Sequence, residues 1–143
     1  MRKQPKSNSQ QPTANSQQPT ANSQQHGRIL VVDDEAAVRM FIAAALESAG
    51  HANIIEAEDG QEAYELVQRF GRTIKLVITD MQMPRMNGAE LVKRLATEYP
   101  TISIVCMSGY SDSIPPAGHD FLEKPFSPAT LLRSVEAAIR QTG

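Results

Sequence analysis

The sequence predicts an α/β domain built on a parallel sheet with helices on both faces. Five short apolar runs, at residues 29–32, 53–57, 74–79, 102–107 and 120–124, alternate with stretches of helical periodicity. The first run, "ILVV", is continuously apolar and contains β-branched residues, which is typical of a strand covered on both faces. Strand–helix alternation at this spacing favours a parallel sheet of five strands with helices on both sides.

The stretches between the runs place their apolar residues on one side of a helix. The first, "EAAVRMFIAAALESAG", ends at Gly50, and the second, "GQEAYELVQRFG", ends at Gly71, a residue type that commonly terminates helices. Asn87 is expected to cap a third helix. Ser127 and Pro128 are expected to be the cap and the first residue of the last helix.

Residues 1–27 differ in composition from the rest of the chain. The segment "NSQQPTA" occurs at 8–14 and again at 15–21, and a further copy begins with "NSQQ". A polar, proline-containing segment of this kind cannot bury enough apolar surface to offset the entropy lost on ordering. We therefore expect a disordered tail over 1–27, followed by one folded domain over 28–143.

Charge and composition exclude several classes of protein. The chain has 14 basic and 16 acidic residues, and the three charged residues before residue 28 are all basic, so the domain itself is acidic. An acidic domain does not favour direct nucleic-acid binding, which needs a basic face. No apolar run approaches the ~20 residues of a membrane span, and the basic residues near the N-terminus are not followed by the hydrophobic stretch of a secretory signal, so we expect none. With one cysteine, Cys106, no internal disulfide is possible, and we expect a cytoplasmic protein without membrane contact.

Polar residues follow four of the five predicted strands. Asp33 and Asp34 end the first, Asp80 the third, Ser108 the fourth and Lys124 the fifth. Right-handed crossovers between parallel strands bring these ends to one edge of the sheet, where ligands bind in such folds. We therefore expect these five side chains to form one site.

The chemistry of this set indicates phosphoryl transfer. Carboxylates about 4 Å apart repel by about 4 kcal/mol at an effective dielectric near 20, unless one is protonated or a cation lies between them. Oxygen ligands with open positions suit Mg²⁺, and a lysine and a serine suit the oxygens of a phosphoryl group. In such a site Asp80 would be the nucleophile that forms an aspartyl phosphate.

Four motifs in the expected order make the chain similar to a known family. The segments "VVDDE", "ITDMQMPRMNG", "MSGY" and "DFLEKPFS" resemble the receiver domain of bacterial two-component response regulators, over residues 28–142. The resemblance implies a flavodoxin-like sheet in the order 2-1-3-4-5. It also implies that Asp80 accepts a phosphoryl group from a sensor histidine kinase or a histidine phosphotransfer protein.

The resemblance further implies roles for the other site residues. Asp34, supported by Asp33, would hold Mg²⁺ together with Asp80 and the backbone carbonyl of Gln82. Lys124 would pair with Asp80 and then with the phosphoryl oxygens, across a cis peptide bond to the following proline.

Two residues take the positions of a switch in the family. Ser108 would move toward the phosphoryl group, and Phe121 would follow it inward. For Phe121 a plain role as a core aromatic of the strand stays equally open.

The chain departs from the family between the fourth and fifth strands. Only ten residues, Gly109 to Gly118, lie there, whereas an average helix takes about 11–12 residues. Pro115 and Pro116 would also end a helix before its second turn. We expect the fourth helix of the family to be missing or shortened.

These features favour a phosphoacceptor switch that is not an enzyme, apart from self-catalysed phosphotransfer and slow autodephosphorylation. We expect no output domain in this chain, which would be stand-alone or the terminal receiver of a hybrid kinase and would act on a downstream protein. The alternative is a pseudo-receiver that binds proteins independently of phosphorylation.

Two enzymatic or ligand-binding classes fit less well. A haloacid dehalogenase-type hydrolase would need an aspartate where Gln82 stands and a nucleophile on the first strand. Nucleotide binding would need a glycine-rich loop, which "VVDDEAA" lacks.

Overall fold

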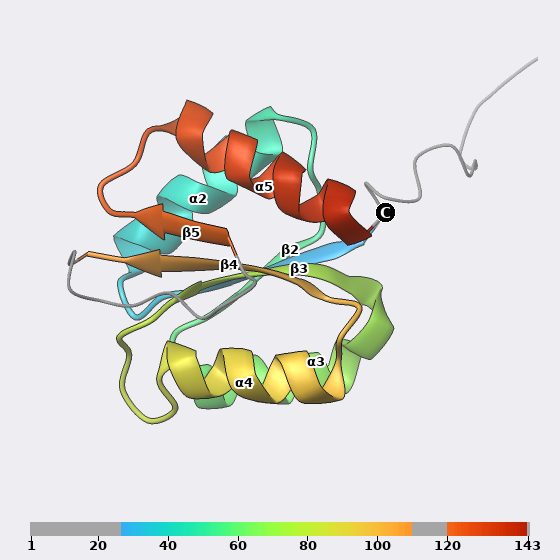
Figure 1. The fold of residues 1–143 in the computed structure, drawn as a ribbon. Helices are drawn as coiled ribbons and strands as arrows, with labels where there is room; N and C mark the ends of the chain where they lie inside the picture. Colours follow the sequence, from blue (N-terminus) through green and yellow to red (C-terminus); the bar gives the residue numbers. More distant parts are fainter. Residues whose placement is uncertain (1–26, 110–119, 143) are drawn as a thin grey trace, which may run out of the picture.

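A five-stranded parallel sheet forms the centre of the structure (Figure 1). The computed structural model describes residues 27–109 and 120–142. All neighbouring strands, in the order β2-β1-β3-β4-β5, pair in parallel. The strands are β1 (Arg28–Val32), β2 (Ile54–Ala57), β3 (Ile74–Asp80), β4 (Ser103–Ser108) and β5 (Asp120–Glu123). The predicted flavodoxin-like fold class and the strand order 2-1-3-4-5 are therefore confirmed.

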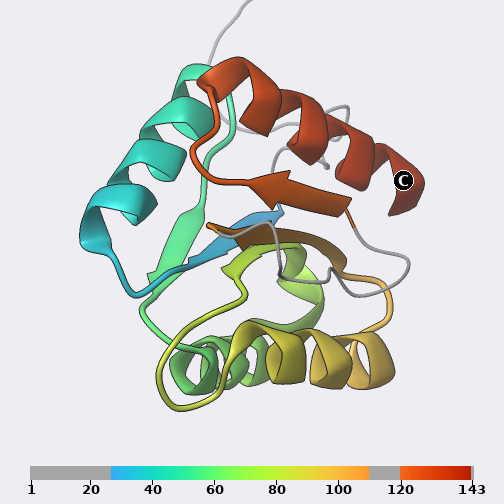
Figure 2. The ribbon, with the colours of Figure 1, turned by 60° about the vertical axis from the view of Figure 1, so that its left-hand side comes forward.

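Helices cover both faces of the sheet. Figures 1 and 2 show α2 and α5 on one face and α3 and α4 on the other. Within the described residues the helices are α2 (Ala36–Ser48), α3 (Gly60–Phe70), α4 (Gly88–Glu98) and α5 (Pro128–Thr142), with a short 3-10 turn, η3 (Gly71–Thr73), after α3. None of these helices has the length and apolar character that crossing a membrane requires.

The residues of β1 explain why its sequence is apolar without interruption. Ile29 and Val31 pack into the core under α2 and α5, while Leu30 and Val32 pack into the core on the side of α3 and α4. All four side chains are fully buried. Each such burial stabilises the fold by about 1.5–3 kcal/mol, so neither face of this strand tolerates a polar residue.

The predicted helix ends are confirmed by the hydrogen bonds found there. Asn87 accepts a hydrogen bond from a backbone N–H in the first turn of α4 at 2.9 Å, and Ser127 does the same for α5 at 3.1 Å. Pro128 is the first residue of α5. Gly50 and Gly71 have φ angles of 96° and 48°, the left-handed conformation that glycine adopts without strain.

Several strand boundaries differ by one residue from the predicted runs. Asn53 has a φ of 61°, so β2 begins at Ile54 rather than at residue 53. Asp80 and Ser108 are the last residues of β3 and β4, because strand pairing continues one residue past the apolar runs. β5 ends at residue 123, one residue early. The polar groups of the predicted site are therefore held by the sheet itself or directly follow it.

Two predictions concern residues that the structure does not describe. The tail expected to be disordered spans 1–27, of which the structure leaves out 1–26, and the segment expected to lack a full helix spans 109–118, of which it leaves out 110–118. These parts lie outside the described residues, and both expectations stay predictions.

Candidate functional site

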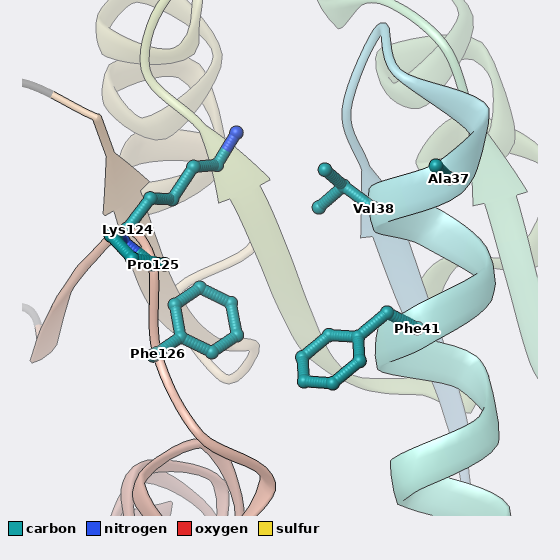
Figure 3. A pocket seen from close by; sticks show the side chains of 6 residues that line it. All are labelled: Ala37, Val38, Phe41, Lys124, Pro125 and Phe126. Atoms are coloured by element: carbon teal, nitrogen blue, oxygen red, sulfur yellow. The ribbon is translucent and has the colours of Figure 1, made fainter.

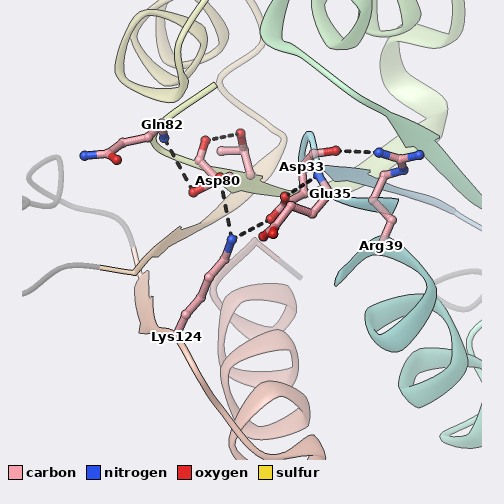
Figure 4. Close-up of polar contacts among 7 residues, drawn as sticks. Asp33, Glu35, Arg39, Asp80, Gln82 and Lys124 are labelled. Carbon is pink, nitrogen blue, oxygen red and sulfur yellow. Dashed lines mark hydrogen bonds and ion pairs between the residues drawn. The ribbon is translucent and has the colours of Figure 1, made fainter. Parts of the chain in front are cut away.

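Four strands bring polar side chains to one edge of the sheet. Asp33 directly follows β1, Asp80 and Ser108 end β3 and β4, and Lys124 directly follows β5. The strand ends are level because residue 80 pairs with Met107 and Ser108 with the last residue of β5. Figure 4 shows Asp33, Asp80 and Lys124 pointing toward one another from these strands.

Asp80 is nearly buried, with 7% of its surface exposed. Its Oδ2 lies 3.6 Å from Nζ of Lys124, and its Oδ1 accepts a long hydrogen bond of 3.4 Å from the N–H of Gln82. Burial raises the pKa of Asp80, and the Asp33 carboxylate acts in the same direction. Lys124 and the N–H donors lower this pKa without cancelling the rise, so Asp80 is a carboxylate that lacks sufficient cationic compensation.

Lys124 lies between two carboxylates. It donates a 2.7 Å hydrogen bond to Oδ2 of Asp33 and forms the longer ion pair with Asp80. Burial lowers the pKa of Lys124, but the hydrogen bond to Asp33 and the charges of both aspartates outweigh it, so the pKa is raised. The resemblance implied a partner in Asp80, whereas the shorter contact here is to Asp33. The Lys124–Pro125 bond is cis, as expected.

Three carboxylates form a cluster with the geometry of a cation site. One oxygen each from Asp33, Asp34 and Asp80 lies within 4.8 Å of the other two. Asp33 is fully buried and Asp34 is exposed, so the cluster opens toward solvent on one side. Three carboxylate oxygens converging this closely match the hard oxygen ligands that Mg²⁺ prefers, so the residues present fit that ion.

The two predicted switch residues occupy different depths. Ser108 is 1% exposed at the end of β4, and its carbonyl accepts a 2.7 Å hydrogen bond from the N–H of Lys124. Phe121 is partly buried on β5 opposite Cys106, and it packs against the core on the side of α3 and α4. The switch roles of Ser108 and Phe121 stay predictions.

An arginine of α2 anchors the loop that carries the first aspartates. Arg39 donates through Nη1 to the carbonyl of Asp33 at 2.6 Å (Figure 4). It also donates through Nε to Glu56 of β2 at 2.9 Å. Asp33 also accepts from the N–H of Glu35 at 2.9 Å, which holds the carboxylate at the start of α2. Sequence reasoning missed Arg39, because an isolated arginine in the first turns of a helix resembles any solvated residue.

A glycine holds the other loop close to the phosphoacceptor candidate. Gly88 begins α4, and a Cβ at this position would lie 2.2 Å from the backbone oxygen of Asp80. The N–H of Gly88 donates to the carbonyl of Met81 at 3.1 Å. The segment "MQMPRMN" is therefore closed into a compact loop whose two ends meet beside Asp80.

An apolar pocket of about 280 Å³ adjoins the site (Figure 3). The pocket lies between the first turns of α2 and the segment after β5, and Lys124 forms part of its wall. The ring centroids of Phe41 and Phe126 lie 6.0 Å apart across it. Phe41, which lines the pocket together with Lys124, is 39% exposed, and the preceding Met40 is 67% exposed, so this part of α2 presents large apolar side chains to solvent.

Comparisons with known proteins agree with this geometry. The sequence pattern of the family described as "Response regulator receiver domain" matches residues 29–136. A "Chemotaxis protein CheY homolog" from Campylobacter jejuni is 37% identical over 117 residues, covering 76% of this chain and 89% of that protein. "Sensor kinase CckA" from Brucella abortus is 35% identical over 119 residues, covering 79% of this chain and 12% of the kinase.

A solved structure confirms the likeness in three dimensions. The crystal structure of "a two component transcriptional regulator AraC" from Clostridium phytofermentans ISDg has a TM-score of 0.71 at 33% identity, covering 80% of this chain and 92% of that one. The chain belongs to the receiver domains of two-component response regulators. Members of this family are in general phosphoacceptors rather than enzymes, and they work with histidine kinases.

Proposed function

We propose that this receiver domain is a phosphorylation switch in which Asp80 accepts a phosphoryl group. The donor is the phosphohistidine of a sensor histidine kinase or of a histidine phosphotransfer protein. A carboxylate oxygen of Asp80 forms the new P–O bond while the P–N bond breaks. The donor ring is protonated on its other nitrogen, so the histidine leaves as a neutral imidazole. The observation that carries the proposal is the convergence of Asp33, Asp34, Asp80 and Lys124 at one sheet edge.

Asp33, Asp34, Asp80 and the backbone carbonyl of Gln82 would hold Mg²⁺. When bound, the ion supplies positive charge that neutralises the carboxylates and the charge developing on the transferred group. Lys124 contributes a second positive charge, 3.6 Å from a carboxylate oxygen of Asp80. The raised pKa of Asp80 supports the proposal, because it marks a carboxylate placed where further cationic charge is favourable.

The change of charge at Asp80 would operate the switch. A phosphoryl group adds negative charge and acceptor oxygens, which favour transfer of Lys124 from Asp33 to the new group. The hydroxyl of Ser108 would donate a hydrogen bond to a phosphoryl oxygen, and the side chain of Phe121 would follow Ser108 toward the core. The altered surface would then be recognised by a downstream protein. The intact acidic cluster and lysine argue against the alternative pseudo-receiver.

The apolar pocket supports a protein as the donor. Phe41 and Phe126 border Lys124, so a partner that brings a phosphohistidine to Asp80 covers apolar surface as it approaches. Replacing Phe41 with serine is expected to slow phosphorylation by a protein donor and to leave phosphorylation by acetyl phosphate unchanged.

Incubation with acetyl phosphate and Mg²⁺ tests the phosphoacceptor role. We expect the intact protein to gain the mass of one phosphoryl group, and the gain to disappear with a chelator or in Asp80→Asn. Asp34→Ala is the matched variant for the metal, because it removes an exposed carboxylate of the same cluster and keeps the nucleophile. A wild-type protein that is folded but gains no mass would refute the proposal.

A further inference from the structure

The segment after β2 contacts the β3–α4 loop, which directly follows the proposed phosphoacceptor. β2 itself brings no predicted site residue to the sheet edge, yet Asp59, two residues beyond its end, contacts Arg85 in the β3–α4 loop. Nε and Nη2 of Arg85 lie 2.9 and 2.6 Å from Oδ2 of Asp59. The Asp59 side chain is only 8% exposed, so its charge needs a partner, whereas Arg85 is 62% exposed and reaches it from outside.

Asp59 is itself held in place by the start of α3. Its Oδ1 caps the helix by accepting a 2.8 Å hydrogen bond from the N–H of Glu62. The Glu62 carboxylate in turn accepts from the N–H of Glu58, the residue before the cap, at 2.9 Å. The first turn of α3 is therefore tied to both residues that precede it. One oxygen of Asp59 therefore serves the helix, and the other serves Arg85. Because the helix cap fixes the Asp59 carboxylate, its ion pair with Arg85 can hold the β3–α4 loop in one position.

The backbone of the β3–α4 loop also contacts the first residue of α3. The N–H of Gly60 donates to the carbonyl of Met86 at 3.0 Å, and a Cβ on Gly60 would lie 2.1 Å from that oxygen. Arg85 has a φ of 64°, an unfavourable conformation for a residue with a side chain. Figure 2 shows the loop between β3 and α4 passing the beginning of α3. The ion pair thus accompanies a strained turn that it can help to stabilise.

The opposite end of the loop belongs to the proposed site. Gln82 donates its N–H to Asp80 and stands three residues before Arg85. A displacement at Arg85 would therefore be transmitted through a short, closed loop to the backbone of Gln82, the proposed carbonyl ligand of Mg²⁺.

We propose that Arg85 is a positioning residue, which holds the β3–α4 loop on Asp59 so that the backbone of Gln82 faces the metal site. The inference rests on the proposed function and adds to it a tie to the start of α3. It predicts that Mg²⁺ affinity depends on an ion pair whose members do not belong to the acidic cluster.

Variants of Arg85 and Asp59 distinguish the contribution of the ion pair from those of the α3 cap and of the backbone turn at Arg85. Arg85→Ala removes the guanidinium, Arg85→Lys keeps the charge, and Arg85→Gly keeps the turn while relieving its strain. Asp59→Asn removes the charge but keeps an oxygen for the cap of α3. Arg94→Ala is the matched control, because it removes an exposed arginine that pairs with Glu90 on α4 at 3.2 Å.

Calorimetric titration of the full chain with MgCl₂ measures the effect on the metal site. We expect the dissociation constant to rise about two- to fivefold in Arg85→Ala and Arg85→Gly, because the loss of affinity cannot exceed the free energy of an ion pair of this exposure. Arg85→Lys should give an intermediate value, and Arg94→Ala should match wild type. The double variant Asp59→Asn/Arg85→Ala should have the same Mg²⁺ dissociation constant as either single variant, because each substitution removes the same ion pair.

Two further readouts distinguish positioning from a general loss of stability. Without metal, the amides of Gly60 and Gly88 should exchange with solvent about two- to fivefold faster in Arg85→Ala, the factor expected from an ion pair of this exposure, while the central amides of α4 stay unchanged. With acetyl phosphate, the half-saturating Mg²⁺ concentration should rise, and the rate at saturating Mg²⁺ should stay near that of wild type.

The outcomes are separable. Wild-type affinity and loop exchange in both Arg85→Ala and Arg85→Gly would overturn the inference while leaving the proposed function intact. A uniform rise in exchange across α4, with an unchanged Mg²⁺ dependence, would also overturn it. A wild-type protein that neither binds Mg²⁺ nor becomes phosphorylated would overturn the proposed function, and the inference with it.

Discussion

Replacing Asp80 by asparagine should stabilise the metal-free protein. Asp80 is buried to 7% exposure within a cluster of three carboxylates, and one lysine, already hydrogen-bonded to Asp33, is the cation beside it in the described structure. Asparagine has nearly the same shape and carries no charge. The substitution therefore removes the electrostatic cost of Asp80 without opening a cavity.

The contacts set the size of the effect. At an effective dielectric near 20, attraction to Lys124 at 3.6 Å is worth about 4.6 kcal/mol. An oxygen of Asp33 and one of Asp34 lie within 4.8 Å of an oxygen of Asp80, so repulsion by each carboxylate costs about 3.5 kcal/mol or more. Repulsion exceeds attraction by about 2 kcal/mol or more; solvent screening of the exposed Asp34 reduces this difference, and burial of Asp80 increases it. We expect Asp80→Asn to raise the free energy of unfolding by about 1–2 kcal/mol.

The gain should depend on pH in one direction. The pKa of Asp80 is raised by burial and by Asp33, so the folded state binds this proton more tightly than the unfolded state does. Below the unfolded-state pKa the group is neutral in both states, and the advantage of asparagine is absent. The advantage grows as pH rises toward the folded-state pKa and is complete above it.

Urea denaturation of both proteins in chelator, from acidic to neutral pH, measures this difference. Added Mg²⁺ should reduce or reverse it, because binding to the folded state stabilises wild type more than the variant. Equal or lower stability of Asp80→Asn at neutral pH without metal would refute the electrostatic reasoning. So would a gain that is the same at every pH.

Other variants and reagents test the packing, the thiol and the metal site. Gly88→Ala should lower the free energy of unfolding by about 1–3 kcal/mol in urea, because its Cβ would meet the backbone oxygen 2.2 Å away; an unchanged midpoint would contradict this. Burial raises the pKa of Cys106 to about 12, so iodoacetamide at neutral pH should leave the native thiol unmodified, and alkylation as fast as in urea would contradict this. Asp34→Ala should raise the Mg²⁺ dissociation constant by about tenfold or more in calorimetry, and an unchanged constant would remove Asp34 from the site.

The parts of the fold that follow from local patterns were predictable. The continuous apolar run of β1 indicated burial on both faces, and Ile29 to Val32 are fully buried. Asn87 and Ser127 were recognisable as caps, because their side chains satisfy N–H groups that a helix leaves without partners. The convergence of Asp33, Asp80 and Lys124 followed from topology, since parallel strands bring their carboxyl ends to one edge.

The contacts between loops were not predictable in the same way. Arg39 joins Glu56, and Arg85 joins Asp59 across 26 residues, and neither pair has a spacing that indicates contact. The hydrogen bond from Lys124 to Asp33 rather than Asp80 depends on side-chain geometry at the sheet edge. One signal was available: Asp59, followed three residues later by Glu62, is the pattern of a reciprocal helix cap.

Locating the phosphoryl group within the chain tests the central claim most directly. After treatment with acetyl phosphate and Mg²⁺, the acyl phosphate is trapped by reduction with borohydride, and the peptides are sequenced by mass spectrometry. The account predicts a single modified residue, Asp80, and no modification when Mg²⁺ is chelated. Modification of another aspartate, or equal modification in Asp80→Asn, would contradict it.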